Sequence, residues 1–141
     1  MIKTHDFYLA SPFFNPEQVE RVNYVNLRLR DLGYKVWSPS HDGTVVSPRE
    51  GVDIQKRIFE LNCLMIKRSN YVFAITDGKD IGTIWECGYA YAKNVPIVYF
   101  AETLNGPFNL MLAQSGIKVI STRYDIDNTL LDSRIFKGEI E

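Results

Sequence analysis

Three acidic side chains lie within ten residues of one another, between two apolar runs of the chain. Asp77, Asp80 and Glu86 follow residues 71–76 (YVFAIT) and precede residues 96–101 (PIVYFA). If both runs are buried strands, the acids belong to the loop and first helical turn at the carboxyl end of the first one, where α/β proteins bind ligands. Paired carboxylates are the groups that cleave glycosidic bonds. The cluster therefore predicts chemistry on a sugar.

The local sequence leaves a purely structural role open for two of these acids. Thr83 and Glu86 have the Thr-x-x-Glu spacing of a capping box, in which the glutamate accepts a hydrogen bond from a backbone N–H at the start of a helix. Asp77 is also consistent with a solvated loop acid or with one that complements the helix dipole. Taken alone, this stretch favours capping for Glu86.

Other common catalytic and binding motifs are missing from the sequence. It contains no G-x-G-x-x-G, no G-x-x-x-x-G-K-[ST] and no G-x-S-x-G. The two histidines, His5 and His41, belong to no zinc-binding pattern. We therefore expect neither a metal nor an organic cofactor.

Composition favours one small cytoplasmic domain with a small-molecule partner. A chain of 141 residues that is 45% apolar can bury one core, so we expect a single domain over residues 1–141. The formal net charge of -1 gives no reason to expect a nucleic-acid polymer or a membrane surface as partner. Cys63 and Cys87 lie in apolar helical patterns without an export segment before them, which indicates reduced thiols and the cytoplasm.

Short apolar runs alternate with helical patterns along the chain. Strands are predicted at residues 6–11, 34–39, 71–76, 96–101 and 118–122, and helices at 16–32, 52–67, around Glu86, at 108–114 and in a final tail. Gly33 is expected to end the first helix. Apolar strands that alternate with helices predict an α/β, flavodoxin-like three-layer sandwich with a five-stranded parallel sheet of order 2-1-3-4-5.

Three separated motifs resemble the nucleoside 2-deoxyribosyltransferase family. They are YLASPFF at residues 8–14, DIGTIWECGYA at 80–90 with NVPIV following, and FNLM at 108–111. The match extends over most of the chain. It implies a retaining pentosyltransferase of nucleotide salvage that cleaves the N-glycosidic bond of a 2′-deoxyribonucleoside and transfers the sugar to another nucleobase.

The resemblance also implies the roles of the catalytic residues. Glu86 matches the nucleophile that attacks the anomeric carbon and forms a covalent 2-deoxyribosyl ester. Asp80 matches an acid that holds the substrate, and Tyr8 matches a tyrosine that hydrogen-bonds the nucleophile and orients it. For Glu86, this evidence favours catalysis over capping.

Further positions match substrate contacts in the family. Asn109 and Met111 match a motif that a neighbouring subunit donates to close the sugar pocket, which implies a dimer-based homo-oligomer with shared active sites. Phe13, together with Phe14, resembles the aromatic wall against which the base packs. Burial in the core is the alternative for these aromatic rings and for Met111. Asp77 and Gly82 complete the predicted substrate-binding set.

One stretch departs from the family pattern. Many members carry Asn-Asp-Leu on the second helix, whose Asp is a candidate proton donor to the leaving base, whereas this chain has Leu61-Asn62-Cys63. Asn62 can donate a hydrogen bond but no proton at neutral pH. Either Asp80 replaces that donor, or the preferred bases need little protonation, or the correspondence is shifted by one residue.

Two other functions stay open from the sequence. A hydrolase of 2′-deoxynucleoside 5′-monophosphates would use the same fold and glutamate, with a phosphate site for which Arg21 or Arg49 with Ser11 are candidates. Such hydrolases tend to have serine where this chain has Asn109, so Asn109 favours transfer. The departure at Asn62 also leaves open a non-catalytic nucleoside-binding module.

Overall fold

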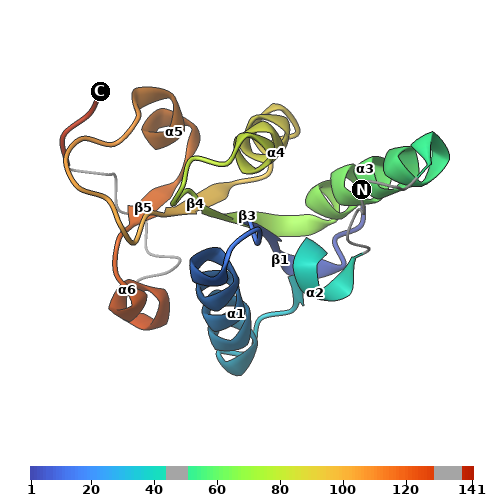
Figure 1. The fold of residues 1–141 in the computed structure, drawn as a ribbon, viewed down its shortest axis with the longest axis horizontal. Coiled ribbons are helices and arrows are strands. Elements are labelled where there is room, and N and C mark those ends of the chain that lie inside the picture. Colours follow the sequence, from blue (N-terminus) through green and yellow to red (C-terminus); the bar gives the residue numbers. More distant parts are fainter. Residues whose placement is uncertain (44–50, 129–137) are drawn as a thin grey trace.

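The computed structural model describes residues 1–43, 51–128 and 138–141 and shows a five-stranded sheet between two layers of helices (Figure 1). The strands are β1 (His5–Ala10), β2 (Val36–Trp37), β3 (Ser69–Ile75), β4 (Ile97–Phe100) and β5 (Lys118–Ile120). The helices are α1 (Pro16–Asp31), α2 (Pro39–Asp42), α3 (Val52–Lys67), α4 (Ile81–Ala92), α5 (Leu110–Ser115) and α6 (Arg123–Asn128). Neighbouring strands are parallel in the order β2-β1-β3-β4-β5. This confirms the predicted α/β class and strand order.

Alternate residues of β1 face the two helical layers, because successive side chains of a strand point to opposite faces of its sheet. Phe7 and Leu9 belong to the buried cluster that α1 and α6 cover, whereas Tyr8 and Ala10 belong to the cluster that α3 and α4 cover. Figure 1 shows α1 and α6 on one side of the sheet and α3, α4 and α5 on the other. Tyr8 therefore points toward the helix that carries Glu86.

Several element boundaries differ from the predictions. The second strand was predicted at residues 34–39, but β2 contains only two residues because Pro39 already begins α2, a short helix that the sequence pattern did not predict. Proline lacks a backbone N–H and is favoured at the first position of a helix. Gly33 follows the C-cap of α1 with a φ of +94°, as predicted. Of the predicted helical tail, α6 is observed, and residues 129–137 lie outside the described residues.

A tight turn between β3 and α4 positions the helix over the sheet. Gly78 and Lys79 have φ values of +83° and +52°, and the N–H of Lys79 donates to the carbonyl of Thr76 over 2.9 Å. Glycine adopts such positive φ values without steric cost. The turn sends α4 back across the sheet, where it packs against β1, β3 and β4. Residues of α4 can therefore meet side chains of β1.

Candidate active site

Tyr8 and Glu86 form the centre of the candidate site. Tyr8 lies in β1 and is fully buried, whereas Glu86 is half-buried in the second turn of α4 and not in its first turn, where the sequence placed it. The Tyr8 hydroxyl donates a hydrogen bond to Oε2 of Glu86. Among the described residues, none donates a hydrogen bond to Oε1 of Glu86. The carboxylate is thus held through one oxygen and has a second oxygen free to react.

The surroundings of this pair change the acidity of both groups. Burial raises the pKa of Glu86 from 4.5 to about 7, the hydrogen bond from Tyr8 opposes the increase, and the charge of Asp80 adds to it. Burial, together with the charge of Glu86, also raises the pKa of Tyr8 well above 10. Tyr8 therefore keeps its proton at neutral pH and stays a hydrogen-bond donor, while a desolvated Glu86 carboxylate is a stronger nucleophile than a hydrated one.

Asp80, and not Thr83, caps α4. Its Oδ2 accepts hydrogen bonds from the backbone N–H and from the hydroxyl of Thr83, each over 2.9 Å. A capping box requires its glutamate at the third helical position, and that position is occupied by Thr83, three residues before Glu86. The capping interpretation of Glu86 is therefore wrong. Gly82 is exposed, and a Cβ there would lie 3.4 Å from Oδ2 of Asp80, so glycine leaves this carboxylate uncovered.

Asp77 is buried and connects the ends of β3 and β4. Its Oδ1 accepts a hydrogen bond from the backbone N–H of Glu102 over 3.1 Å. Its Oδ2 accepts from the backbone N–H and the hydroxyl of Thr103, both over 2.6 Å. Only 6% of Asp77 is exposed, so the alternative of a solvated loop acid is wrong. The carboxylate holds the loop after β4 against the loop after β3.

Asp77→Ala is expected to lower the free energy of unfolding by about 2–4 kcal/mol, because it removes the buried, charged acceptor of three hydrogen bonds. Thermal and urea denaturation measure this change. Asp31→Ala is the matched control, since Asp31 is exposed and makes only a 3.7 Å ion pair with Arg28. That control should alter stability by less than about 0.5 kcal/mol. Equal effects of the two substitutions would contradict the anchoring role of Asp77.

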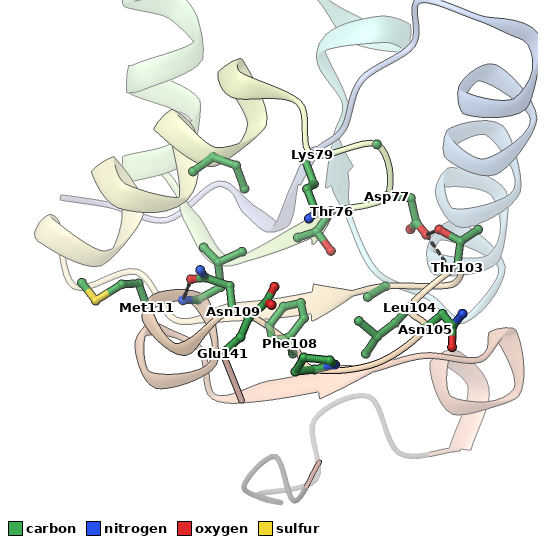
Figure 2. A pocket seen from close by; sticks show the side chains of 15 residues that line it. Thr76, Asp77, Lys79, Thr103, Leu104, Asn105, Phe108, Asn109, Met111 and Glu141 are labelled. Carbon is green, nitrogen blue, oxygen red and sulfur yellow. Dashed lines mark hydrogen bonds between the residues drawn. The ribbon is translucent and has the colours of Figure 1, made fainter. Parts of the chain in front are cut away.

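A cavity of about 670 Å³ opens at the carboxyl ends of β3 and β4 (Figure 2). Asn109, Met111 and Ile84 line it, but Tyr8 and Glu86 do not. Ile84 and Glu86 are two residues apart, so they point about 200° apart around the helix. Within this chain, α4 therefore separates Glu86 from Asn109 and Met111.

Asn109 and Met111 stand at the start of α5. Asn109 is the N-cap of this helix and accepts a hydrogen bond from the N–H of Leu112 over 3.1 Å. The C-terminal residues secure this segment, since the N–H of Leu110 donates to the carbonyl of Glu141 over 2.8 Å. Met111 is 74% exposed, so core filling is the wrong explanation for it. Its side chain is free to contact another molecule.

The other two predicted contacts of the base, Phe13 and Asn62, are both half-buried. Phe13 is half-buried, packs against the core cluster on the α1 side of the sheet and stacks on Phe14 with 5.5 Å between ring centroids. Asn62 is half-buried in α3. Its neighbour Cys63 interacts electrostatically with Glu86: burial and then the charge of Glu86 raise the pKa of the Cys63 thiol.

Arg21, the phosphate-site candidate within the described residues, is buried and already engaged by acids. Its guanidinium pairs with Glu17 over 2.8 Å and with Glu102 over 3.1 Å, and it lies 3.8 Å from Asp77. The Ser11 hydroxyl donates to the carbonyl of its neighbour Pro12. A phosphate would have to displace these carboxylates from Arg21. The other arginine candidate, Arg49, lies outside the described residues.

Metal binding and membrane insertion find no support in the described parts of the chain. Within residues 1–43, 51–128 and 138–141, no three or more His, Cys, Asp and Glu side chains are grouped so that they could hold a metal ion. In those same ranges, each helix is too short or too polar to cross a bilayer.

Comparisons with known proteins bear on the family and the fold. A family model described as nucleoside 2-deoxyribosyltransferase matches residues 7–120. The structure of a 2-deoxyribosyltransferase from Bacillus psychrosaccharolyticus is similar, with a TM-score of 0.79 and 32% identity over 87% of this chain and 90% of that one. A conserved protein from Enterococcus faecalis V583 shares the fold, with a TM-score of 0.70 and 19% identity over 89% of this chain and 95% of that one. No curated protein sequence matches the chain.

Proposed function

Because the chain belongs to the nucleoside 2-deoxyribosyltransferase family, we propose that Glu86 is its nucleophile. The carboxylate attacks C1′ of a 2′-deoxyribonucleoside, the C1′–N bond breaks, and its electron pair leaves with the base. An ester between C1′ and Glu86 results. A nitrogen of a second base then attacks C1′ from the opposite face, loses a proton and releases the carboxylate. Two inversions retain the configuration.

The placement of Glu86 is the observation that supports this proposal. Its carboxylate takes no part in capping α4, is oriented by a fully buried tyrosine and has a pKa of about 7. A glutamate on a solvated surface would need none of these features. Tyr8 orients the carboxylate of Glu86 and stabilises its ionised form. The same hydrogen bond stabilises the carboxylate that is released when the ester is cleaved.

We assign substrate contacts around this pair. Oδ1 of Asp80, to which no described residue donates a hydrogen bond, accepts one from a sugar hydroxyl. Phe13 and Asn62 contact the base. Asp77 shapes the site indirectly, through the loops that it joins.

The leaving base needs a proton or must depart as an anion. Asn62 carries no acidic proton at neutral pH. The thiol of Cys63 has a raised pKa and is a poor proton donor. We therefore propose that the enzyme prefers bases that depart with little protonation. A panel of donor and acceptor bases, analysed for exchange products, tests this preference, and equal rates across bases of very different basicity would contradict it.

We also propose that a second copy of the chain completes each site. Asn109 and Met111 cannot reach Glu86 of their own subunit around α4, and Met111 is largely exposed. In a two-fold symmetric dimer, the same surface of each copy can supply these residues to the other. The exchange reaction then takes place in a homo-oligomer, which we place in cytoplasmic nucleotide salvage.

Mixing two inactive variants tests this sharing. Glu86→Gln and Met111→Ala homo-oligomers are each expected to show little exchange. After subunit mixing, one site of each mixed dimer regains both residues, so about a quarter of wild-type activity should return. Sedimentation measures the oligomeric state of each sample. A failure to regain activity in demonstrably mixed dimers would contradict completion in trans.

Product analysis separates transfer from hydrolysis. The protein is given a second free base together with either a 2′-deoxynucleoside or a 2′-deoxynucleoside 5′-monophosphate. Transfer yields a new nucleoside from the first donor, whereas a 5′-monophosphate hydrolase converts the second donor into free base and deoxyribose phosphate. We expect the new nucleoside, because Arg21 is engaged by carboxylates and is not available to hold a phosphate. Formation of sugar phosphate without base exchange would overturn the transferase proposal.

A further inference from the structure

We propose that Thr83 is a positioning residue, whose hydroxyl orients Asp80 so that the second carboxylate oxygen of Asp80 receives a sugar hydroxyl. This inference rests on the proposed function of Asp80 and Glu86. Thr83 is 1% exposed and lies in the first turn of α4. Residues three apart in a helix share a face, so Thr83 lies beneath Glu86 on the side of α4 that meets the sheet.

Two bonds to one oxygen distinguish this contact from ordinary helix capping. Capping requires only that the Asp80 side chain accept a hydrogen bond from the backbone N–H of Thr83. Here the Thr83 hydroxyl donates to that same oxygen, Oδ2, and both bonds are 2.9 Å long. With Oδ2 held by two donors, rotation of the carboxylate about its terminal torsion is restricted. Oδ1 then keeps a defined direction.

The free oxygen is placed for binding a substrate. Among the described residues, no donor is bonded to Oδ1 of Asp80, and Asp80 is only half-buried. Asp80 is the N-cap of the helix that carries Glu86, and its charge acts on the Glu86 carboxylate. Under the proposed function, a sugar whose C1′ lies at Glu86 presents one of its hydroxyls to Oδ1 of Asp80.

Thr83→Val tests the role of the hydroxyl, because valine keeps the buried shape and removes only the donor. We expect the KM for the 2′-deoxynucleoside to rise by about ten-fold and kcat to change by less than about three-fold, since hydrogen bonds to charged groups are the strong ones. Thr83→Ser retains the hydroxyl and should restore most of the lost affinity. Circular dichroism and thermal denaturation verify that both variants fold.

A matched control is Thr122→Val. Thr122 also begins a helix, since its hydroxyl accepts a hydrogen bond from the N–H of Asp125 over 3.2 Å, but it is exposed and lies at α6, across the sheet from Glu86. A KM increase in this control equal to that of Thr83→Val would show a general helix-start effect and overturn the inference.

The combination with Asp80→Asn tests whether Thr83 acts through Asp80. If it does, Thr83→Val adds no further increase in KM to that of Asp80→Asn, because the carboxylate that it orients is already lost. Additive effects would overturn the inference. A wild-type protein without base exchange would instead refute the proposed function. Exchange that is impaired by Asp80→Asn but not by Thr83→Val would refute the role of Thr83 alone.

Discussion

Replacing Glu86 with glutamine is expected to abolish base exchange while the protein stays folded. Glutamine has nearly the same shape and can still accept the hydrogen bond from Tyr8, but its amide is not a nucleophile that can form the sugar ester. Loss of a nucleophile lowers kcat by on the order of 10⁴- to 10⁶-fold. Chromatography of nucleosides after incubation with a second base measures the rate. Intact-protein mass spectrometry should detect a deoxyribosyl adduct on the wild type and none on the variant.

The same substitution should stabilise the protein at alkaline pH. The pKa of Glu86 rises from 4.5 to about 7 on folding, so folding favours the protonated carboxyl group. The stability linked to this group is fully present below pH 4.5 and is lost as pH rises through 7. Glutamine has no such loss. Thermal denaturation at pH 8 should therefore show Glu86→Gln to be more stable than the wild type by on the order of 1–3 kcal/mol, with little difference at acidic pH.

Glu60→Gln is the matched control for both measurements, because Glu60 is exposed on α3 and, among the described residues, pairs weakly with Lys56 over 4.0 Å. It should affect neither exchange nor the pH dependence of stability. Substantial exchange by Glu86→Gln would refute the nucleophile. A Glu86→Gln variant that is less stable than the wild type at pH 8 would show that the carboxylate is structural.

Tyr8→Phe and Asp80→Asn are expected to shift the pH dependence of exchange in opposite directions. As the proposed nucleophile, Glu86 must be ionised to attack, so kcat/KM of the wild type should rise with pH through about 7. The hydrogen bond from Tyr8 lowers the pKa of Glu86, so Tyr8→Phe moves the rise of kcat/KM, the acidic limb of the pH profile, to higher pH. The charge of Asp80 raises that pKa, so Asp80→Asn moves the limb to lower pH. Kinetics from pH 5 to 9 measure both limbs.

Tyr8→Phe should also lower kcat by about 10- to 100-fold at its own optimum pH, because the carboxylate is no longer oriented toward C1′. Tyr91→Phe is the control, since Tyr91 lies on the same helix and is 62% exposed. Its pH profile should match that of the wild type. Shifts of the Tyr8 and Asp80 variants in the same direction would contradict the electrostatic account of Glu86.

Much of the fold could be predicted because it depends on local patterns. Short apolar strands that alternate with helices specify a parallel sheet, and the predicted order 2-1-3-4-5 is observed. Boundaries were less predictable. Pro39 begins α2 and limits β2 to two residues. The sequence pattern did not reveal this boundary, because residues 34–39 are equally consistent with a longer strand. Edge strands have a hydrogen-bonded neighbour on one side only, which makes their ends depend on the adjoining loop.

By itself, the sequence determined the chemical types of the site residues, the order of the strands and the resemblance that singled out Tyr8 and Glu86. Only the tertiary structure decided which acid caps α4, that Asp77 is buried, and that α4 separates Glu86 from Asn109 and Met111. It also decided the pKa of Glu86, which burial raises and which the hydrogen bond from Tyr8, 78 residues away in the sequence, partly lowers again. These properties depend on distances between segments that are remote along the chain, and local residue patterns do not encode such distances.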